Sequence, residues 1–263
     1  MSASGSTRAR LPGTRPEGAR DETAAARQVR EMFSRIAPRY DLLNHLLSLR
    51  FDVMWRKRLA RRFAGILARP EARVLDLCCG TGDLAIALAG APVSSAGSQP
   101  AALVGADFAR PMLARAREKT ARVARRRLEF VEADALSLPF AEATFDLVAT
   151  AFGFRNLANY AAGLGELRRI LAPGGSLAIL EFAEPRGMIF RGLFNFYFHR
   201  VLPGVGAVIS GHSQAYSYLP ESVTRFPSPG ELAALMERAG FRDVAYEGWT
   251  GGVVTLYSGH AGA

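Results

Sequence analysis

One short segment, from Val74 to Asp83, constrains the fold of this chain more than any other. It reads Val-Leu-Asp-Leu-Cys-Cys-Gly-Thr-Gly-Asp, which is an apolar run, a turn of small residues and the start of a helical pattern. Gly80 and Gly82 carry no Cβ, so a ligand can approach the backbone of this turn closely. The N–H groups at the start of the following helix favour a polar group at the same place. The segment therefore predicts a strand, turn and helix that bind a nucleoside cofactor.

The turn departs from the pattern of proteins that bind nicotinamide dinucleotides. Their Gly-x-Gly-x-x-Gly turn is followed by an acid about 20 residues later. Here Cys78 occupies the first glycine position, and no third glycine follows Gly82 at the required spacing. By itself the turn also fits other α/β proteins that contain a glycine turn.

Two acids that follow later apolar runs narrow the choice. Asp107 closes the run 103–107, where a carboxylate can accept hydrogen bonds from a ribose, and a Pro-, Ser- and Gly-rich insertion at 91–102 precedes that run. Asp134 follows a third run, 128–131. The glycine turn together with these two acids resembles the S-adenosylmethionine-dependent methyltransferases.

Strand and helix patterns alternate through most of the chain. The expected strands cover residues 73–77, 103–107, 128–131, 145–150, 176–182, 243–247 and 253–257. Helical patterns lie between them, and Pro173-Gly174-Gly175 is expected to break the chain before the fifth strand. Such alternation predicts an α/β fold with a mostly parallel seven-stranded sheet and helices on both faces. Together with the resemblance above, it implies the Rossmann-like fold of class I methyltransferases. Ligands bind such sheets at the carboxyl ends of the strands.

The organisation predicted around this sheet is a single domain over residues 23–263. Residues 1–22 are rich in Arg, Pro, Gly and Ser and are expected to form a disordered tail. Helical periodicity in 23–69, with Pro38 between a first helix and a second from Tyr40 to about Ala68, predicts a helical cap over the cofactor site. Alternation stops at 184–229, which predicts a helical, aromatic insertion on the substrate side.

Charge is concentrated in the first quarter of the chain. The protein has 263 residues and a formal net charge of +9, and residues 1–62 hold 14 Arg or Lys against 6 Asp or Glu. This excess fits an anionic membrane surface, a nucleic acid, or simply a solvated tail rich in arginine. We expect no nucleic-acid partner, because the charge lies outside the catalytic core and no basic motif interleaved with aromatic residues occurs.

Cysteine usage and hydropathy indicate a protein of the cytoplasm. The two cysteines, Cys78 and Cys79, are adjacent, which gives no disulfide framework and no metal-ligand spacing. No run of about 18 uncharged apolar residues and no secretory signal is present. We therefore expect a cytoplasmic protein without a metal, and peripheral contact with the inner face of the membrane stays open.

Several segments spread over most of the chain carry recognisable motifs: Phe33–Ser48 with Trp55-Arg56, Thr150–Asn156, Arg169–Ala183, Arg200–Pro203, Tyr216–Ser222 and Phe226-Pro227. Together they resemble one family, the ubiquinone/menaquinone biosynthesis C-methyltransferases. The Phe-Gly-x-Arg-Asn run at 152–156 and the Tyr-x-Tyr-Leu-x-Glu-Ser run at 216–222 are its specific motifs. Three positions depart from the pattern: Leu43 stands for Met, Asp52 for His and Ala183 for Ser or Thr.

The resemblance implies S-adenosyl-L-methionine as the cofactor and assigns residues to it. The implied cofactor contacts are Asp76, Gly80, Thr81, Gly82, Asp107, Asp134, Ala135 and Ala151. Asp107 would hold the ribose hydroxyls, and Asp134 would face the adenine amino group. Asp76 would frame the methionine end, although an acid there could instead brace the loop or cap the helix.

The resemblance also implies the chemistry, which is methylation of a ring carbon of a prenylated quinol. Arg155 and Asn156 would lie at the reacting ring as catalytic residues, although an arginine there could instead be a surface ion-pair partner. Because an arginine is a poor base at its usual pKa, we favour stabilisation of the phenolate over literal proton abstraction. The implied substrate contacts are Tyr40, Asn44, His212, Tyr216 and Tyr218, and a packing role stays open for the tyrosines and the histidine.

A prenyl chain is insoluble in water, so such an enzyme has to meet its substrate at a membrane or a carrier. Phe194, Phe196, Tyr197 and Phe198 could line a channel for the chain or dip into the membrane interface. Alternatively, they could form an oligomer contact, such as that of a homodimer, or pack in the core. Demethylmenaquinol is the favoured substrate and 2-methoxy-6-polyprenyl-1,4-benzoquinol the second. The alternatives are a methyltransferase of another lipid or small metabolite and, of a different class, a nucleic-acid-binding protein.

Overall fold

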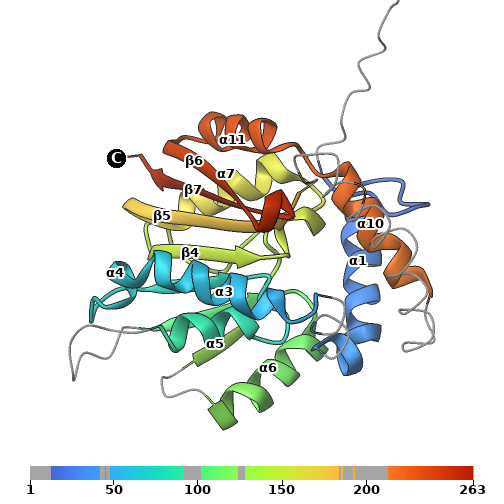
Figure 1. Cartoon of the computed structure of the whole chain (residues 1–263), viewed down its shortest axis with the longest axis horizontal. Helices are drawn as coiled ribbons and strands as arrows, with labels where there is room; N and C mark the ends of the chain where they lie inside the picture. Colours follow the sequence, from blue (N-terminus) through green and yellow to red (C-terminus); the bar gives the residue numbers. More distant parts are fainter. Residues whose placement is uncertain are drawn as a thin grey trace, which may run out of the picture.

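The computed structural model describes residues 13–41, 45, 48–91, 102–123, 128–183, 185, 192 and 213–262. Its centre is a seven-stranded sheet in the order β3-β2-β1-β4-β5-β7-β6 (Figure 1). The strands are β1 (Val74–Leu77), β2 (Leu103–Asp107), β3 (Leu128–Glu132), β4 (Phe145–Ala151), β5 (Leu171–Phe182), β6 (Phe241–Trp249) and β7 (Val254–Ala261). Strands β1 to β5 pair in parallel, and β7 pairs antiparallel with both β5 and β6. The expectation of a mostly parallel seven-stranded sheet is confirmed.

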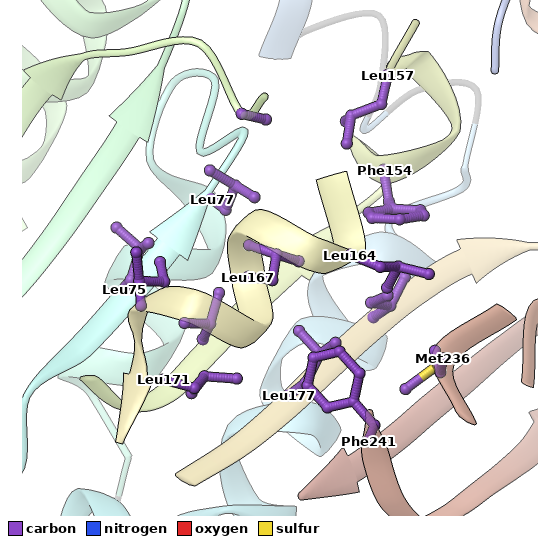
Figure 2. Packing of buried hydrophobic residues seen from close by; sticks show 14 of the residues in the cluster. Leu75, Leu77, Phe154, Leu157, Leu164, Leu167, Leu171, Leu177, Met236 and Phe241 are labelled. Carbon is purple, nitrogen blue, oxygen red and sulfur yellow. The ribbon is translucent and has the colours of Figure 1, made fainter. Parts of the chain in front are cut away.

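Helices cover both faces of this sheet because its buried strands alternate their side chains. In β1, Leu75 and Leu77 belong to a core cluster shared with α7 (Tyr160–Ile170) and α11 (Pro229–Arg238) (Figure 2). Val74 belongs to a second cluster, which contains side chains of α3 (Phe51–Arg62), α4 (Ala64–Leu67) and α5 (Asp83–Ala89). Successive side chains of a strand point to opposite faces of the sheet. The four buried residues of β1 therefore contribute side chains to both core clusters.

Three further helices surround the edge of the sheet at which the strands end. Helix α6 (Arg110–Val123) follows β2 and contacts β3, and α1 (Glu22–Ile36) lies beside α10 (Ser213–Arg225) (Figure 1). Helix α1 begins where the Asp21 carboxylate accepts a hydrogen bond of 2.7 Å from the backbone N–H of Ala24. An acceptor at this position satisfies one of the free donors of the first turn. Pro38 follows the helix in the 3₁₀ turn Ala37–Arg39, as the position of this proline predicts.

The second expected cap helix, from Tyr40 to about Ala68, is wrong as one continuous element. A turn at 48–50 precedes α3, and Leu49 and Arg50 have φ angles of 50° and 64°. Left-handed backbone at two successive residues cannot continue a right-handed helix. Residues 42–44 and 46–47 lie outside the described part of the chain, as does most of the insertion at 184–229 before α10.

The Pro-Gly-Gly turn at 173–175 was expected to precede the fifth strand and instead interrupts it. Leu171 already pairs with Phe145, whereas Ser176 pairs with Leu147 two residues further on. The residues between these pairs bulge out of the ladder, and Gly174 has a φ of +73° that favours glycine. The strand therefore begins directly after α7 and spans Leu171–Phe182.

The N-terminal segment also differs from the expectation of a disordered tail over 1–22. Thr14 is only 4% exposed, and its backbone N–H donates a hydrogen bond of 2.8 Å to the carbonyl of Leu157. Residues 13–21 therefore pack on the domain, while residues 1–12 lie outside the described part. No helix among the described residues is both long enough and apolar enough to cross a membrane.

Truncation of Leu164 to alanine tests the larger core. Its side chain is fully buried among side chains of the sheet and α11 (Figure 2). We expect Leu164→Ala to lower the free energy of unfolding by about 2–5 kcal/mol, because the packed neighbours cannot close the cavity left behind. Urea denaturation measures this change. Leu49→Ala is the matched control: that leucine is 71% exposed, and a comparable loss there would contradict the assignment of the core.

Candidate active site

A cavity lies at the carboxyl ends of β1, β2 and β4. It holds about 740 Å³ of space that opens partly to solvent. Its walls are Leu77, Cys78, Gly80, Ala106–Phe108, Ala133–Leu136, Ala151–Gly153 and Asn156–Ala158, with Ala26, Phe33, Tyr40 and Met112 from the helices above. β1 lies between β2 and β4, so the connections that follow β1 and β4 diverge at this edge of the sheet. That is the position at which open α/β sheets bind ligands.

The glycine turn forms one wall of the cavity, as its composition predicts. Gly80 lines the cavity with a φ of +54°, and a Cβ there would lie 3.7 Å from the ring of Tyr40. Gly82, with a φ of +86°, begins α5 and points away from the cavity, toward Ala116 at 3.3 Å. The first glycine thus leaves room for a ligand, and the second lets α5 and α6 approach each other.

Asp107 ends β2 at the cavity wall and is held by backbone donors. Its Oδ2 accepts a hydrogen bond of 2.9 Å from the N–H of Gly80, and its Oδ1 accepts one of 2.8 Å from Ala109. Burial raises the pKa of Asp107 to about 6, although these backbone N–H groups favour the carboxylate. The carboxyl group of Asp107 is therefore held in one orientation and is mostly ionised at neutral pH.

Five of the eight predicted cofactor contacts line the cavity: Gly80, Asp107, Asp134, Ala135 and Ala151. Asp134 is exposed, and its Oδ1 accepts a hydrogen bond of 2.9 Å from the N–H of Leu136. Its carboxylate therefore stands at the open side of the cavity.

Asp76, Thr81 and Gly82 are not among the lining residues. Asp76 shares the strand face of Val74, beneath α5, because side chains alternate along β1. Burial raises the pKa of Asp76 well above its ordinary value, although the backbone of Ala85 and the charge of Arg56 oppose this. Both carboxylate oxygens of Asp76 are buried without a hydrogen-bond partner among the described residues, so its contact with the cofactor and its role as a brace both stay predictions.

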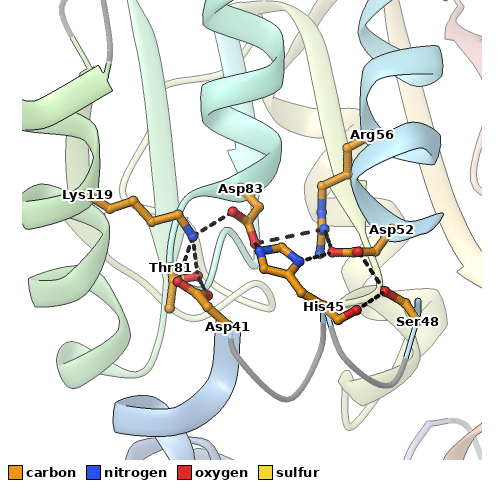
Figure 3. A network of polar contacts seen from close by, with 8 residues as sticks. All are labelled: Asp41, His45, Ser48, Asp52, Arg56, Thr81, Asp83 and Lys119. Carbon is orange, nitrogen blue, oxygen red and sulfur yellow. Dashed lines mark hydrogen bonds and ion pairs between the residues drawn. The ribbon is translucent and has the colours of Figure 1, made fainter. Parts of the chain in front are cut away.

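Thr81 belongs to a polar network that joins the helical cap to the glycine turn (Figure 3). Its hydroxyl donates to the carboxylate of Asp41 and accepts a hydrogen bond of 3.2 Å from Nζ of Lys119. The same Nζ lies 2.8 Å from Asp41 Oδ2 and 2.6 Å from Asp83 Oδ1. One lysine of α6 therefore links the cap to the first turn of α5.

The other half of this network contains Asp52, one of the departures from the family pattern (Figure 3). Asp52 forms an ion pair with Arg56 and lies 2.9 Å from Nδ1 of His45. Although burial favours the neutral acid, Arg56 and the hydroxyl of Ser48 lower the pKa of Asp52. Arg56 also lies 3.8 Å from Asp83. His45, Asp52 and Asp83 bring three ligand atoms together, but these cations already compensate the acids.

Arg155 lies behind the cavity wall and not in it. It belongs to the 3₁₀ turn η2 (Phe154–Asn156), and its guanidinium is 3.0 Å from Glu181 of β5. It also donates to the carbonyl of Phe152 and, at 3.3 Å, to the hydroxyl of Ser222. Burial alone would lower the pKa of Arg155, but Glu181 raises it, so the group stays charged. A 3₁₀ turn has three residues per turn, so Gly153 and Asn156 face the cavity together while Arg155 points away.

Asn156 lines the cavity and is held by a chain of two hydroxyl groups. The hydroxyl of Tyr218 donates a hydrogen bond of 3.0 Å to Asn156 Oδ1 and lies 2.9 Å from Oγ1 of Thr14. Because Tyr218 gives its only proton to Asn156, the Thr14 hydroxyl donates to Tyr218. The amide of Asn156 is therefore oriented from α10 and from the N-terminal segment.

The remaining predicted substrate contacts are only partly described. Tyr40 lines the cavity beside Gly80, and Tyr218 reaches the cavity through Asn156. Tyr216 lies in α10. Asn44 and His212 lie outside the described residues, as do Phe194, Phe196, Tyr197 and Phe198.

Sequence reasoning missed the apolar walls and the partner of Arg155. Phe33, Phe108, Met112 and Phe152 line much of the cavity, yet nothing in their local pattern separates a cavity wall from a core. Glu181 did carry a signal, because it is an isolated charge in the apolar run 177–182. A fully buried acid in such a strand calls for a cationic partner.

Comparison with known proteins agrees with this geometry. The family model described as the ubiE/COQ5 methyltransferase family matches residues 21–261. The chain belongs to this family. It is 51% identical over 228 residues, 87% of this chain and 99% of the relative, to the demethylmenaquinone methyltransferase of Thermus thermophilus. It is 43% identical to the ubiquinone/menaquinone biosynthesis C-methyltransferase UbiE of Geobacter sulfurreducens, with 91% of each chain covered.

Solved structures with lower identity share the fold. A SAM-dependent methyltransferase of Thermotoga maritima, described as a possible histamine N-methyltransferase, aligns with a TM-score of 0.60 at 18% identity. The alignment covers 89% of this chain and 99% of that one. A putative methyltransferase of Haloferax volcanii, solved with its Trm112 activator, aligns with a TM-score of 0.57 at 20% identity, over 88% and 98% of the two chains. The class I methyltransferase fold expected from the sequence is confirmed.

Replacement of Thr14 by valine tests the hydroxyl chain to Asn156. We expect Thr14→Val to lower kcat about five- to tenfold, because one buried hydrogen bond of about 1 kcal/mol no longer orients Tyr218. Steady-state methyl transfer and thermal unfolding, measured together, separate this effect from a loss of fold. Thr224→Val is the matched control, since that hydroxyl bonds only the carbonyl of Pro220 in the same helix. Equal kcat values for the two variants would contradict the role of Thr14.

Proposed function

We propose that this protein transfers the methyl group of S-adenosyl-L-methionine to a ring carbon of a prenylated quinol in respiratory quinone biosynthesis. Demethylmenaquinol is the substrate that we favour, and 2-methoxy-6-polyprenyl-1,4-benzoquinol is the second. The names of the relatives from Thermus thermophilus and Geobacter sulfurreducens support this chemistry. The observation that carries the proposal is Asn156, an oriented amide on the β4 side of a cavity whose acids lie on the β2 and β3 side.

The residues of the cavity fit a nucleoside cofactor. Gly80 leaves space against the turn, Asp107 offers a buried acceptor to ribose hydroxyls, and Asp134 offers an acceptor at the open side. Ala135 and Ala151 are small enough to let a flat base and a thioether approach the wall. When bound, this cofactor supplies a methyl group that its sulfonium has already activated. Asp76, Thr81 and Gly82 support the turn from behind, so we propose that they act on the cofactor indirectly.

The chain itself has to orient the quinol and stabilise the charge that forms on it. Loss of the hydroxyl proton to water gives a phenolate whose ortho carbon is nucleophilic, and a hydrogen-bond donor at that oxygen favours this ionised form. On transfer the methyl–sulfur bond would break to leave a thioether, and the methylated ring carbon would lose its hydrogen to water as a proton. We propose that Asn156 donates its amide N–H to this oxygen, since Tyr218 already occupies Asn156 Oδ1. The apolar walls, Phe33 and Phe152 among them, exclude water from the ring.

Arg155 is proposed as a positioning residue that acts through this wall. Its guanidinium fixes η2 through Glu181 and Phe152, and its charge interacts with the hydroxyls of Tyr40 and Tyr218. Because Glu181 compensates the charge of Arg155 at 3.0 Å, the pair acts by holding η2 in place and not as a free cation. This role removes the need for contact between Arg155 and the ring.

The remaining proposals concern the surroundings of the enzyme. We propose a cytoplasmic protein that meets its substrate at the inner face of the membrane, because the prenyl chain of the quinol resides there. A homodimer is compatible with this arrangement. The nearest alternative is methylation of another lipid or small metabolite in the same cavity, which the substrate comparison below distinguishes.

The first experiment compares two acceptors. We expect transfer of labelled methyl from S-adenosylmethionine to chemically reduced demethylmenaquinone, and weaker transfer to the demethylated benzoquinol precursor. Asn156→Leu, which keeps the size of the side chain and removes the donor, should lower kcat about 100-fold while cofactor binding persists. The double variant Arg155→Ala with Glu181→Gln removes the ion pair behind the cavity wall without leaving a buried acid unpaired. Cofactor binding without transfer to either quinol would refute the proposed substrate.

The pKa of Asp107 predicts how cofactor binding depends on pH. The ionised carboxylate accepts hydrogen bonds from ribose hydroxyls, so affinity should fall as the pH drops through about 6 and the acid gains a proton. Calorimetric binding of S-adenosylhomocysteine between pH 5 and pH 8 measures this dependence. Asp107→Asn should bind more weakly and almost independently of pH over this range. An unchanged pH profile in that variant would assign the titration to another group.

A further inference from the structure

Large apolar side chains are exposed at one end of α3. Four such residues are exposed among the described part of the chain, and three of them lie within six positions: Leu49 at 71%, Phe51 at 42% and Met54 at 47%. The fourth, Tyr246, lies on β6 at 43%. We refer to Leu49, Phe51 and Met54 as the apolar tip. A cluster of this kind next to a helix start has no packing role that accounts for its exposure.

The surface that continues from the apolar tip is basic. Arg50, Lys57, Arg58, Arg61 and Arg62 are all exposed. Phe51, Met54, Arg58 and Arg61 follow one another at three- and four-residue spacing, so they share one side of the helix. Asp52, the one acid of α3, is buried and paired with Arg56, and Glu247 compensates only Arg58, at 2.6 Å. The exposed side of α3 therefore combines apolar groups with an excess of positive charge.

An open groove of about 930 Å³ runs along the same helix, between α3 and α5. Lys57 and Arg61 stand at its edge, and Val53, Ala60 and Ile86 provide apolar surface within it. α3 itself lies on the outside of the molecule, in front of the sheet (Figure 1). Asp83 also lines the groove, so Lys57 and Arg61 supply positive charge at the edge of a surface that is partly apolar.

Aromatic contacts connect the apolar tip to the wall of the cavity. The ring of Phe51 stacks on Trp55 with 5.9 Å between centroids, and Trp55 lies 6.0 Å from Phe152. Phe152 lines the cavity in which we place the quinol. Two ring contacts thus separate an exposed apolar surface from the candidate active site.

We propose that the apolar tip and the basic side of α3 dock this protein on an anionic lipid bilayer. The three apolar side chains enter the interfacial region of the bilayer, and Arg50, Lys57, Arg61 and Arg62 meet the anionic headgroups. This inference rests on the proposed function, because a prenylated quinol resides in the bilayer. Docking by the tip brings the wall at Phe152 toward the lipid in which the substrate resides.

Binding of the full-length protein to vesicles tests this surface without any quinol. We expect co-sedimentation with vesicles of phosphatidylcholine and phosphatidylglycerol, weak binding to phosphatidylcholine alone, and loss of binding at high salt. Phe51→Ser with Met54→Ser, and separately Lys57→Glu with Arg61→Glu, should each lower the partition coefficient more than about tenfold. The second pair contacts no ring of the aromatic path, so its result stands even if loss of Phe51 disturbs Trp55.

Matched variants on the opposite side of the sheet serve as controls. Tyr246→Ser removes an equally exposed aromatic ring, and Arg238→Glu with Arg242→Glu makes the same charge change at the end of α11 and on β6. Both should bind vesicles within about twofold of the parent protein. Parent-like binding by the two α3 variants, or no binding by the parent protein, overturns the proposal. The proposal is also overturned if the parent protein is a dimer that the α3 variants dissociate and if none of these proteins binds vesicles.

Two assays separate this proposal from the proposed function. With a short-chain, water-soluble quinol and no vesicles, the α3 variants should keep the kcat of the parent protein. With a long-chain quinol embedded in anionic vesicles, the same variants should lose about tenfold in kcat/KM. Vesicle binding that depends on α3, together with no transfer to any quinol, would support docking and refute the proposed substrate.

Discussion

The cavity exists because β1 lies between β2 and β4 and all three strands run in the same direction. Parallel strands end at a common edge, and the connections that follow β1 and β4 diverge there, because α5 and α7 belong to different core clusters. The glycine turn, Asp107 and Asn156 belong to three such connections and meet around one space. A change of strand order would disperse these groups, even if every local pattern were kept.

Buried charges then fix the parts that the sheet alone does not. Glu181 of β5 has no exposed surface, and its ion pair with Arg155 ties β5 to η2 and, through Ser222, to α10. A buried carboxylate without this partner would cost several kcal/mol. The pair therefore holds the turn in the orientation that presents Asn156 to the cavity. Loss of Arg155 would in consequence disturb the site without any direct role in the chemistry.

Ion pairs also hold the cap in place, and one helix of the cap carries the surface that we propose for the membrane. Lys119 joins Asp41 to Asp83, and Arg56 joins Asp52 to the same helix start, so the cap lies on the cofactor turn through ion pairs (Figure 3). With its acid buried, α3 shows the solvent a basic side and an apolar tip. The contacts that attach the cap to the catalytic domain and the surface that we propose for the membrane thus belong to one helix.

The order of the seven strands along the chain and five of the residues that line the cavity could be predicted from the sequence. The strand 103–107 and its terminal Asp107 have the predicted bounds, because an apolar run that ends in an acid is a local signal. The sequence could not show that Asn156 faces the cavity while Arg155 lies behind the cavity wall. This difference depends on the three-residue period of η2 and on Glu181, 26 positions after Arg155. Nor could the sequence show that Thr14, in a segment of disordered composition, supports Tyr218 from 204 positions away. Only the tertiary structure decides such contacts, because burial and hydrogen-bond geometry depend on neighbours that are distant in the chain.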